Sequence, residues 1–282
     1  MKIERTINEI LNEKPLSIEY IKTGLTNDNY HVITQNHNVV IRIPRIENHG
    51  LFNYVHEQKV LKMLEHTSLD TPLVYFNSKS GIKVNEYIGN HDTFSPQYLD
   101  RAAMLIKTLH QQNLTSGIHF DLLKKFDDYK NRVSNPIFDT SFAFDYLKHA
   151  SEISTNHILC HNDLVAGNLL FTNSRDYLID YEYAMDNDPF FDIMSFITEN
   201  DIQDAYLRTQ FYDIYFKRPL TQRDYQRLKL FEIAHHTLWC EWAMMMFESS
   251  PLPIYQEIAQ LKYQRLTELF SDPNITQLLY IK

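Results

Sequence analysis

Short apolar runs separated by polar turn residues fill the stretch from residue 158 to residue 199. Three of these runs stand at residues 158–160, 169–171 and 177–179. Runs of this length, bounded by turn residues, are typical of short buried strands. Polar side chains that can bind a metal ion or a proton lie beside the ends of the runs: Asp163, Asn168 and Asp180. We therefore expect these side chains to lie at strand ends and in the loop between them, facing one cleft.

The same three side chains suit the transfer of a phosphoryl group to a hydroxyl group. That reaction needs a carboxylate to orient the hydroxyl group and accept its proton, and it needs oxygen ligands for Mg²⁺ on the nucleotide phosphates. Asp163 fits the first role. Asn168 and Asp180 fit the second, because Mg²⁺ usually takes one or two carboxylates and keeps water and phosphate as its other ligands. Two ordinary turns with polar caps would produce the same spacing, so the pattern alone leaves both interpretations open.

Four motifs follow one another in this stretch: CHNDL at residues 160–164, GN at 167–168, IDYEYA at 179–184 and FDI at 191–193. Together they resemble the choline and ethanolamine kinases, which belong to the aminoglycoside-phosphotransferase-like group and are distant relatives of protein kinases. The resemblance implies an enzyme that uses ATP and Mg²⁺ to phosphorylate the hydroxyl group of choline. It implies that the catalytic residues are Asp163, Asn168 and Asp180, of which the last two bind the metal ion. His161 is expected to support the catalytic loop and stays outside the catalytic set.

A glycine-containing turn near the N-terminus is the first candidate for binding the nucleotide. It reads GLTNDNY at residues 24–30 and joins two predicted strands, at residues 16–21 and 31–34. The backbone N–H groups of such a turn, with nearby polar side chains, can hold phosphate oxygens, although an ordinary hairpin fits the sequence as well. The pattern resembles the phosphate loop of choline-type kinases, which implies nucleotide contacts for Gly24, Thr26 and Asn27.

Arg42 interrupts the apolar strand predicted over residues 38–44. An arginine on the buried side of a strand needs an anionic partner. Glu57 is the natural candidate, on an amphipathic helix predicted over residues 51–66. The pair resembles the strand cation and helix glutamate of kinases, where choline kinases commonly carry arginine, and it implies that Arg42 binds phosphate oxygens. The alternative is an exposed arginine on an edge strand, whose ion pair would contribute little.

Residues where the chain leaves the N-terminal sheet complete the expected nucleotide site. Residues 73–76 and 82–88 predict the last strands of the sheet, and Gly89 with the polar residues 90–92 predicts a connection. By resemblance to kinases this connection is the hinge that meets adenine, although a plain linker also fits the sequence. The resemblance implies that adenine lies against Glu86, Ile88, Leu170 and Ile179.

The two tryptophans of the chain stand three residues apart, at 239 and 242, in a helix predicted over residues 222–248. This spacing places them on one helix face, where tryptophans usually belong to the core. The resemblance changes this interpretation, because L-W-x-x-W is similar to the aromatic wall that holds the trimethylammonium group of choline. It implies substrate contacts, together with Asp163, for Tyr183, Glu199, Trp239, Trp242 and Tyr255. Residues 247–253 depart from the family pattern, so the residues that form the far rim of the pocket stay unassigned.

Helical periodicity predicts most of the remaining architecture. A helix at residues 3–11 covers the sheet, and further helices are predicted at residues 95–112, 120–133, 141–149, 190–200, 203–216, 222–248 and 254–270. With the resemblance, this pattern indicates a two-lobed α+β kinase-like fold with the nucleotide between the lobes. The small antiparallel-sheet lobe is expected over residues 1–88, and the mainly helical lobe over residues 89–282. His110 is expected to be a hydrogen-bonded residue of the core.

Composition limits the classes of partner and location. The net charge of −9 argues against a nucleic-acid partner, and no apolar run is long enough to span a membrane. Two cysteines without metal-type spacing, Cys160 and Cys240, and a charged N-terminal segment fit a cytoplasmic protein. The alternatives to choline are ethanolamine, thiamine or an aminoglycoside as the substrate of the same fold, or a pseudokinase that only binds nucleotide. The sequence does not indicate an oligomeric state.

Overall fold

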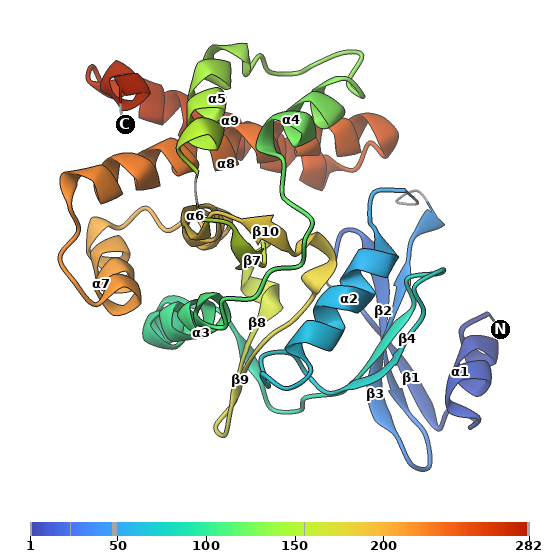
Figure 1. Cartoon of the computed structure of the whole chain (residues 1–282). Coiled ribbons are helices and arrows are strands. Elements are labelled where there is room, and N and C mark those ends of the chain that lie inside the picture. Colours follow the sequence, from blue (N-terminus) through green and yellow to red (C-terminus); the bar gives the residue numbers. More distant parts are fainter. Residues whose placement is uncertain (1, 23, 47–49, 155, 281–282) are drawn as a thin grey trace. The chain divides into compact units, whose positions relative to one another are not determined.

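The computed structural model of the chain describes residues 2–22, 24–46, 50–154 and 156–280 (Figure 1). Backbone contacts divide the chain into two compact units. Unit 1 consists of Met1–Leu105 and Ala166–Ala184, and unit 2 consists of Ile106–Val165 and Met185–Lys282. The lobe boundary predicted after residue 88 falls inside unit 1. Each unit is therefore built from two separate stretches of sequence.

A five-stranded antiparallel sheet forms the N-terminal part of unit 1, in the order β1-β2-β3-β5-β4. Its strands are β1 (Ser17–Ile21), β2 (Asn27–Ile33), β3 (Asn38–Pro44), β4 (Leu73–Phe76) and β5 (Lys83–Glu86). Successive side chains of a strand point to opposite faces of a sheet, so Ile41 and Arg42 in β3 face opposite sides. Ile41 shares an apolar cluster with Ile7 of α1 (Lys2–Leu11), whereas Arg42 reaches Glu57 of α2 (Tyr54–Leu64). The two helices therefore cover opposite faces of this sheet (Figure 1).

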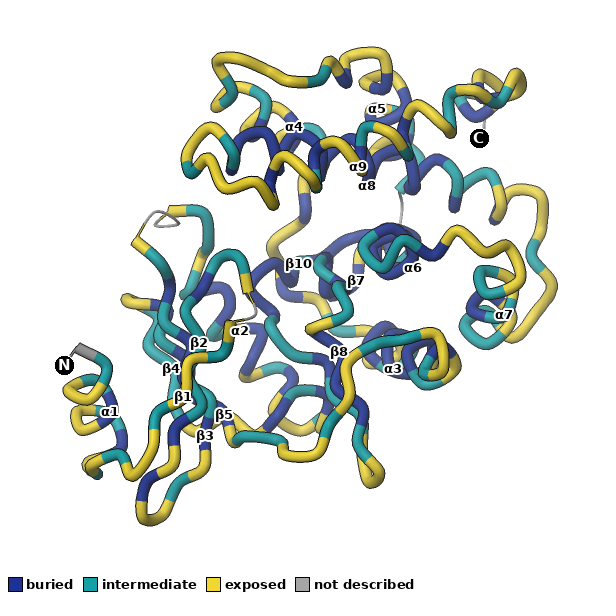
Figure 2. The backbone as a smooth tube through the Cα atoms, turned by 180° about the vertical axis from the view of Figure 1, so that it is seen from behind, coloured by how far each residue is buried: buried dark blue, intermediate teal, exposed yellow. Residues whose placement is uncertain are grey.

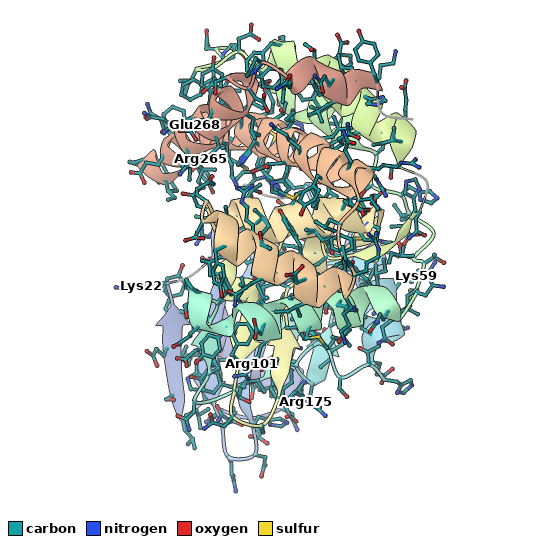
Figure 3. The ribbon with its side chains drawn as sticks, turned by 90° about the vertical axis from the view of Figure 1, so that its left-hand side faces the viewer. Lys22, Lys59, Arg101, Arg175, Arg265 and Glu268 are labelled. Carbon is teal, nitrogen blue, oxygen red and sulfur yellow. The ribbon has the colours of Figure 1, made fainter. Side chains whose placement is uncertain are left out.

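A second sheet in unit 1, in the order β6-β8-β9, leads to the residues predicted to bind metal. β8 (Leu169–Phe171) and β9 (Asp176–Leu178) pair as a hairpin, and β6 (Asp92–Thr93) pairs with the other edge of β8. Arg101, near the start of α3 (Leu99–Gln111), holds the turn of the hairpin (Figure 3). Its Nη2 donates to the Thr172 carbonyl at 2.5 Å, and its Nε donates to Asp176 at 3.0 Å. This anchoring fixes the hairpin whose opposite end carries residues 168 and 180.

Helix α8 (Gln222–Ser249) is the centre of unit 2. It packs against α4 (Leu122–Lys130), α5 (Phe144–Ile153), α6 (Pro189–Glu199) and α9 (Pro253–Phe270). Its middle turns are buried continuously (Figure 2), as expected of a helix enclosed by other helices. Thr221 and Asp224 form a capping box at its start, which satisfies two N–H groups of the first turn. The two-stranded sheet of β7 (Ile158–Cys160) and β10 (Met185–Asn187) and the helix α7 (Ala205–Phe216) complete the unit.

The predicted strands and helices are present, with shifts at their ends. β2 begins at Asn27 and not at His31, because its ladder with β3 continues as far as the pair Asn27–Pro44. The strands β6 and β10 are not predicted by the sequence, because they are too short and too polar for a periodic pattern. Short 3-10 helices occur at Pro96–Tyr98, Ser141–Ala143, Ala166–Asn168, Tyr181–Tyr183 and Ile275–Tyr280. Within the described ranges, no helix combines the length and the apolar character needed to cross a membrane.

Candidate active site

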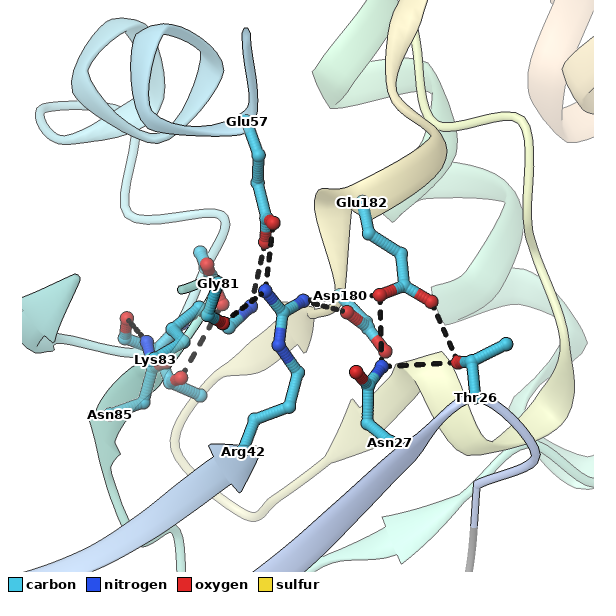
Figure 4. Close-up of polar contacts among 11 residues, drawn as sticks. Thr26, Asn27, Arg42, Glu57, Gly81, Lys83, Asn85, Asp180 and Glu182 are labelled. Atoms are coloured by element: carbon cyan, nitrogen blue, oxygen red, sulfur yellow. Dashed lines mark hydrogen bonds and ion pairs between the residues drawn. The ribbon is translucent and has the colours of Figure 1, made fainter. Parts of the chain in front are cut away.

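Arg42 is the centre of a buried charge cluster in unit 1 (Figure 4). Its Nη2 donates to Glu57 Oε2 at 2.7 Å, and its Nη1 donates to Asp180 Oδ1 at 2.8 Å and lies 3.5 Å from Glu182 Oε2. Nη2 also donates to the Gly81 carbonyl at 3.2 Å. Only 4% of Arg42 is exposed. The predicted pair with Glu57 is therefore present, and the alternative of an exposed arginine on an edge strand is wrong.

The charge cluster contains more carboxylates than cations. Glu57, Asp180 and Glu182 face Arg42, and Lys83 Nζ lies 3.8 Å from Glu57 Oε1. Burial alone would lower the pKa of Arg42, but the three carboxylates raise it above its usual range. Burial, and then the neighbouring Asp180, raise the pKa of Glu182 to about 8. When all of these groups are ionised, three carboxylates face two cations and leave one negative charge in excess, which either protonation of Glu182 or the binding of a further cation would balance.

Asn168 and Asp180, the predicted metal ligands, lie at the same end of the β8–β9 hairpin. The Ile179 N–H donates to the Asn168 carbonyl at 2.9 Å, which extends the pairing beyond the two strands. The side chain of Asp180 is 28% exposed, against 1% for Glu57 and 2% for Glu182. Asp180 is therefore the carboxylate of the cluster that an ion from solvent can reach. An amide oxygen and a carboxylate are donors that Mg²⁺ takes in proteins, so the residues present fit this metal.

The turn predicted to hold the phosphates has a backbone conformation that favours glycine. Gly24 has a φ of 109°, which residues with a side chain rarely adopt. The side chains that follow it are turned toward Glu182: Thr26 Oγ1 donates to Oε1 at 2.8 Å and Asn27 Nδ2 donates to Oε2 at 2.9 Å. In this structure the two side chains therefore fix Glu182, and their contact with a nucleotide stays a prediction.

The residues predicted to meet adenine all belong to unit 1. Glu86 ends β5, where its N–H donates to the Pro72 carbonyl at 2.9 Å. The Ile88 carbonyl accepts a hydrogen bond from His91 Nδ1 at 2.6 Å. The Glu86 N–H is thus engaged within the protein, whereas the Ile88 carbonyl keeps a second lone pair with which it can accept a further hydrogen bond. The remaining predicted contacts are a buried residue of β8 and the residue after β9, Leu170 and Ile179.

The loop that carries Asp163 is held within unit 2. Asp192 accepts the backbone N–H of His161 at 2.7 Å and that of Asn162 at 2.6 Å. The Asp163 N–H in turn lies 3.3 Å from His161 Nδ1, which accepts from it. His161 is fully buried, whereas Asp163 is partly exposed. Asp163 is thereby a partly exposed residue on a fixed backbone, and the burial of His161 agrees with a supporting role.

Two acidic residues to which the sequence assigns no role each hold one predicted site segment within its own unit. Glu182 binds the turn after Gly24, and Asp192 binds the Asp163 loop. Burial alone would raise the pKa of Asp192, but His110 lowers it through a hydrogen bond and its charge. The His110 ring lies between two hydrogen-bond partners: its Nε2 is 2.9 Å from Asp192 Oδ2, and its Nδ1 is 2.7 Å from the Tyr215 hydroxyl. The prediction of a hydrogen-bonded core histidine is thereby confirmed. Both acids stand inside the IDYEYA and FDI motifs, which is the only signal that the sequence offers for them.

The predicted substrate wall forms a contiguous aromatic cluster in unit 2. The rings of Trp239 and Trp242 meet edge to face with centroids 5.4 Å apart, and those of Trp242 and Tyr255 with centroids 5.8 Å apart. Trp239 Nε1 donates to His235 Nε2 at 2.6 Å, and His235 Nδ1 lies 3.6 Å from Glu199 Oε1. The structure thus brings together four of the predicted substrate residues, which we call the aromatic cluster (Trp239, Trp242 and Tyr255) and its neighbouring acid, Glu199.

The fifth predicted pocket residue, Tyr183, belongs to unit 1. Its ring meets that of Phe52 edge to face, with centroids 5.0 Å apart. The tryptophans of the aromatic cluster are 6% and 7% exposed, which suits a core position as well as the wall of a closed pocket. The substrate contacts of all these residues therefore stay predictions.

Comparison with known proteins places the chain among phosphotransferases. A profile of the phosphotransferase enzyme family matches residues 17–231. The protein LicA of Haemophilus influenzae is 26% identical over 248 residues, which are 79% of this chain and 91% of that protein. The ethanolamine kinase of Drosophila melanogaster is 30% identical over 128 residues, which are 38% of this chain and 24% of that protein.

Solved structures share the fold over nearly the whole chain. The choline kinase LicA from Streptococcus pneumoniae superimposes with a TM-score of 0.83 at 24% identity, over 96% of this chain and 99% of that one. LicA in complex with AMP superimposes with a TM-score of 0.81 at 24% identity, over 95% of this chain and 98% of that one. The predicted α+β fold of the kinase type, with an antiparallel sheet in the N-terminal part and helices in the C-terminal part, is confirmed.

Proposed function

Because this chain belongs to the phosphotransferase enzyme family, we propose that it transfers the γ-phosphoryl group of ATP to the hydroxyl group of choline, producing phosphocholine. Membership of the family makes the chain a small-molecule kinase. The choice of choline is supported by the similarity to LicA over most of both chains and by the solved choline kinase LicA with the same fold. Ethanolamine kinases match over a shorter stretch, so ethanolamine is the main alternative.

The aromatic cluster is the observation that carries the choice of choline. A quaternary ammonium group has no N–H to donate, and it is held instead by the faces of aromatic rings, each worth about 0.5–2 kcal/mol. Trp239, Trp242 and Tyr255 supply three such rings in contact with one another. Thiamine and aminoglycosides carry amino or hydroxyl groups that need polar partners when they are buried, and a wall of three aromatic rings offers few of these.

Asp163 is assigned the role of the base. Its carboxylate orients the choline hydroxyl group and accepts its proton as the hydroxyl oxygen bonds to the γ-phosphorus. At the same time the bond between that phosphorus and the β–γ bridging oxygen breaks, which releases ADP. The hydrogen bonds from His161 and Asn162 to Asp192 hold the backbone on which this carboxylate stands. A base held in position in this way contributes about 10²–10⁴-fold to the rate.

Unit 1 is assigned the nucleotide. Arg42, oriented by Glu57, and the backbone N–H groups of the turn at Gly24 would bind phosphate oxygens. Asn168 and Asp180 would hold Mg²⁺, which when bound neutralises charge on the β- and γ-phosphate oxygens. The adenine contacts assigned by resemblance remain those of Glu86, Ile88, Leu170 and Ile179.

A panel of alcohols in a coupled assay of ADP release tests the proposed function. The purified chain is mixed with ATP and Mg²⁺ and with choline, ethanolamine, thiamine or an aminoglycoside in turn. We expect the highest kcat/KM with choline. A higher value with another alcohol would replace choline by that substrate, and the absence of ADP release with every alcohol would favour a nucleotide-binding pseudokinase.

A cytoplasmic location, expected from the cysteine content, belongs to the same proposal. Cys160 and Cys240 are both free and buried, as is usual in a reducing compartment. Fractionation of cells that express the tagged chain tests the location, and recovery with the membrane fraction would contradict it.

A further inference from the structure

Glu199, the acid beside the aromatic cluster, is paired with a lysine from a neighbouring helix. Lys262 of α9 donates from Nζ to Glu199 Oε1 at 2.6 Å and to the Thr198 carbonyl at 3.1 Å. Only 3% of Lys262 is exposed. Both partners stand in the last turn of α6, where carbonyl groups lack partners within the helix and a cation is favoured. The ammonium group is therefore a fixed part of this site.

A hydrogen-bonded histidine connects this pair to the aromatic cluster. Trp239 Nε1 can only donate, so His235 Nε2, 2.6 Å away, accepts and the ring proton stands on Nδ1. Nδ1 lies 2.5 Å from Thr198 Oγ1 and 3.6 Å from Glu199 Oε1. Burial, and then the charge of Lys262, hold the pKa of His235 well below its usual range, so the ring is neutral. Of the two residues next to Glu199, His235 is uncharged. Lys262 therefore supplies the positive charge that compensates the Glu199 carboxylate.

We propose that Lys262 is a specificity-determining residue, which favours a quaternary over a primary ammonium substrate by neutralising Glu199 and occupying one of its oxygens. This inference rests on the proposed function of the same pocket. A primary ammonium group carries three N–H donors, for which a free carboxylate is the strongest acceptor. A quaternary ammonium group has no such donor, so a carboxylate attracts it through charge alone and the aromatic rings attract it through cation–π contacts. When the carboxylate is bound to lysine, both substrates lose charge attraction, but only ethanolamine also loses a hydrogen-bond acceptor, so the pocket favours choline.

The ratio of kcat/KM for ethanolamine to kcat/KM for choline tests this role. In Lys262→Met the Glu199 carboxylate is released, and we expect the ratio to rise about 10-fold, as for one added hydrogen bond to a charged group. Removing the carboxylate as well, in Lys262→Met/Glu199→Gln, should return the ratio to near the wild-type value. Lys262→Gln keeps an N–H donor for the Thr198 carbonyl, so it provides the same test, with a rise in the same direction, if the methionine variant fails to fold.

Lys229→Met is the matched control, because Lys229 of α8 is also paired with a carboxylate, that of Asp272 and not that of Glu199. Its loss should leave the ratio unchanged. A purely structural role of Lys262 would lower both kcat/KM values and the melting temperature while the ratio stays constant, and that result overturns the inference. A wild-type enzyme that phosphorylates neither amino alcohol refutes the proposed function itself. An active wild type with an unchanged ratio in the Lys262 variants refutes only the role of Lys262.

Discussion

Replacing Glu57 by glutamine is expected to lower the free energy of unfolding. Glu57 is 1% exposed, and its Oε2 accepts a hydrogen bond from Arg42 Nη2 at 2.7 Å. Glutamine keeps the shape and an acceptor oxygen but removes the charge. Removing one partner of a buried ion pair costs about 3–5 kcal/mol when the other charge is left uncompensated. Asp180 and Glu182 still face Arg42, so we expect a smaller loss, near that of one hydrogen bond to a charged group, about 1.5–3 kcal/mol.

The same substitution should weaken the binding of ATP more than that of choline. Without the Glu57 charge, the Arg42 guanidinium is drawn toward Asp180 and Glu182 and loses the orientation proposed for phosphate binding. We expect the KM for ATP to rise about 10-fold, which corresponds to about 1.4 kcal/mol, and the KM for choline to change much less. Steady-state kinetics with each substrate varied, and urea unfolding followed by tryptophan fluorescence, measure the two effects.

Glu9→Gln is the matched control for Glu57→Gln. Glu9 accepts a hydrogen bond from Arg5 Nε at the same distance of 2.7 Å, but the two side chains are 58% and 82% exposed. Exposed ion pairs contribute little to stability, so this variant should unfold and bind ATP as the wild type does. If Glu57→Gln behaves like Glu9→Gln in both assays, the buried pair has no part in the nucleotide site and the reasoning is wrong.

Three further predictions concern the proposed base and metal ligand, the proposed substrate wall and the buried Glu182. Asp163→Asn should lower kcat by about 10²–10⁴-fold and Asp180→Asn should abolish most turnover, while circular dichroism shows an intact fold in both. Only Asp180→Asn should alter the dependence of the rate on Mg²⁺. A near-normal kcat in Asp163→Asn would refute the role of Asp163 as the base. Trp239→Leu or Trp242→Leu should raise the KM for choline by about 2- to 30-fold with little change for ATP, and phenylalanine should be milder than leucine. A lower melting temperature with unaltered choline affinity would instead return both tryptophans to the core. Burial, and then Asp180, raise the pKa of Glu182 from 4.5 to about 8, so its contribution to stability is complete below pH 4.5 and is lost as the pH rises through about 8. Urea unfolding across this range should show a steeper fall of stability in the wild type than in Glu182→Gln, and parallel profiles would contradict the shift.

The helices, the longer strands and the Arg42–Glu57 pair were predictable because each depends on a local pattern. The apolar run of β3 and the amphipathic period of α2 are each visible within a short stretch of sequence. A charged residue in an apolar strand requires a partner, and Glu57 stands on the next helix along the sequence. The pair is therefore a local consequence of one strand followed by one helix, and the structure contains it.

Contacts between polar residues that are far apart in the sequence could not be predicted in this way. Glu182 binds Thr26 across 156 residues, and Lys262 binds Glu199 across 63 residues. Lysines are among the residues least often buried, so the helical period of α9 gives no reason to place Lys262 inside the protein. Its burial follows from a carboxylate and a helix-end carbonyl that only the tertiary structure brings beside it.

The proposed phosphorylation of the choline hydroxyl group by ATP, with Asp163 as the proposed base, is tested directly by phosphorus NMR. The purified chain, ATP, Mg²⁺ and choline are mixed, and the resonances of the γ-phosphate, inorganic phosphate and phosphocholine are followed with time. We expect the phosphomonoester resonance of phosphocholine to grow together with ADP in the wild type and to stay at background in Asp163→Asn. Release of ADP and inorganic phosphate without phosphocholine, or equal formation of phosphocholine by both proteins, would contradict this mechanism.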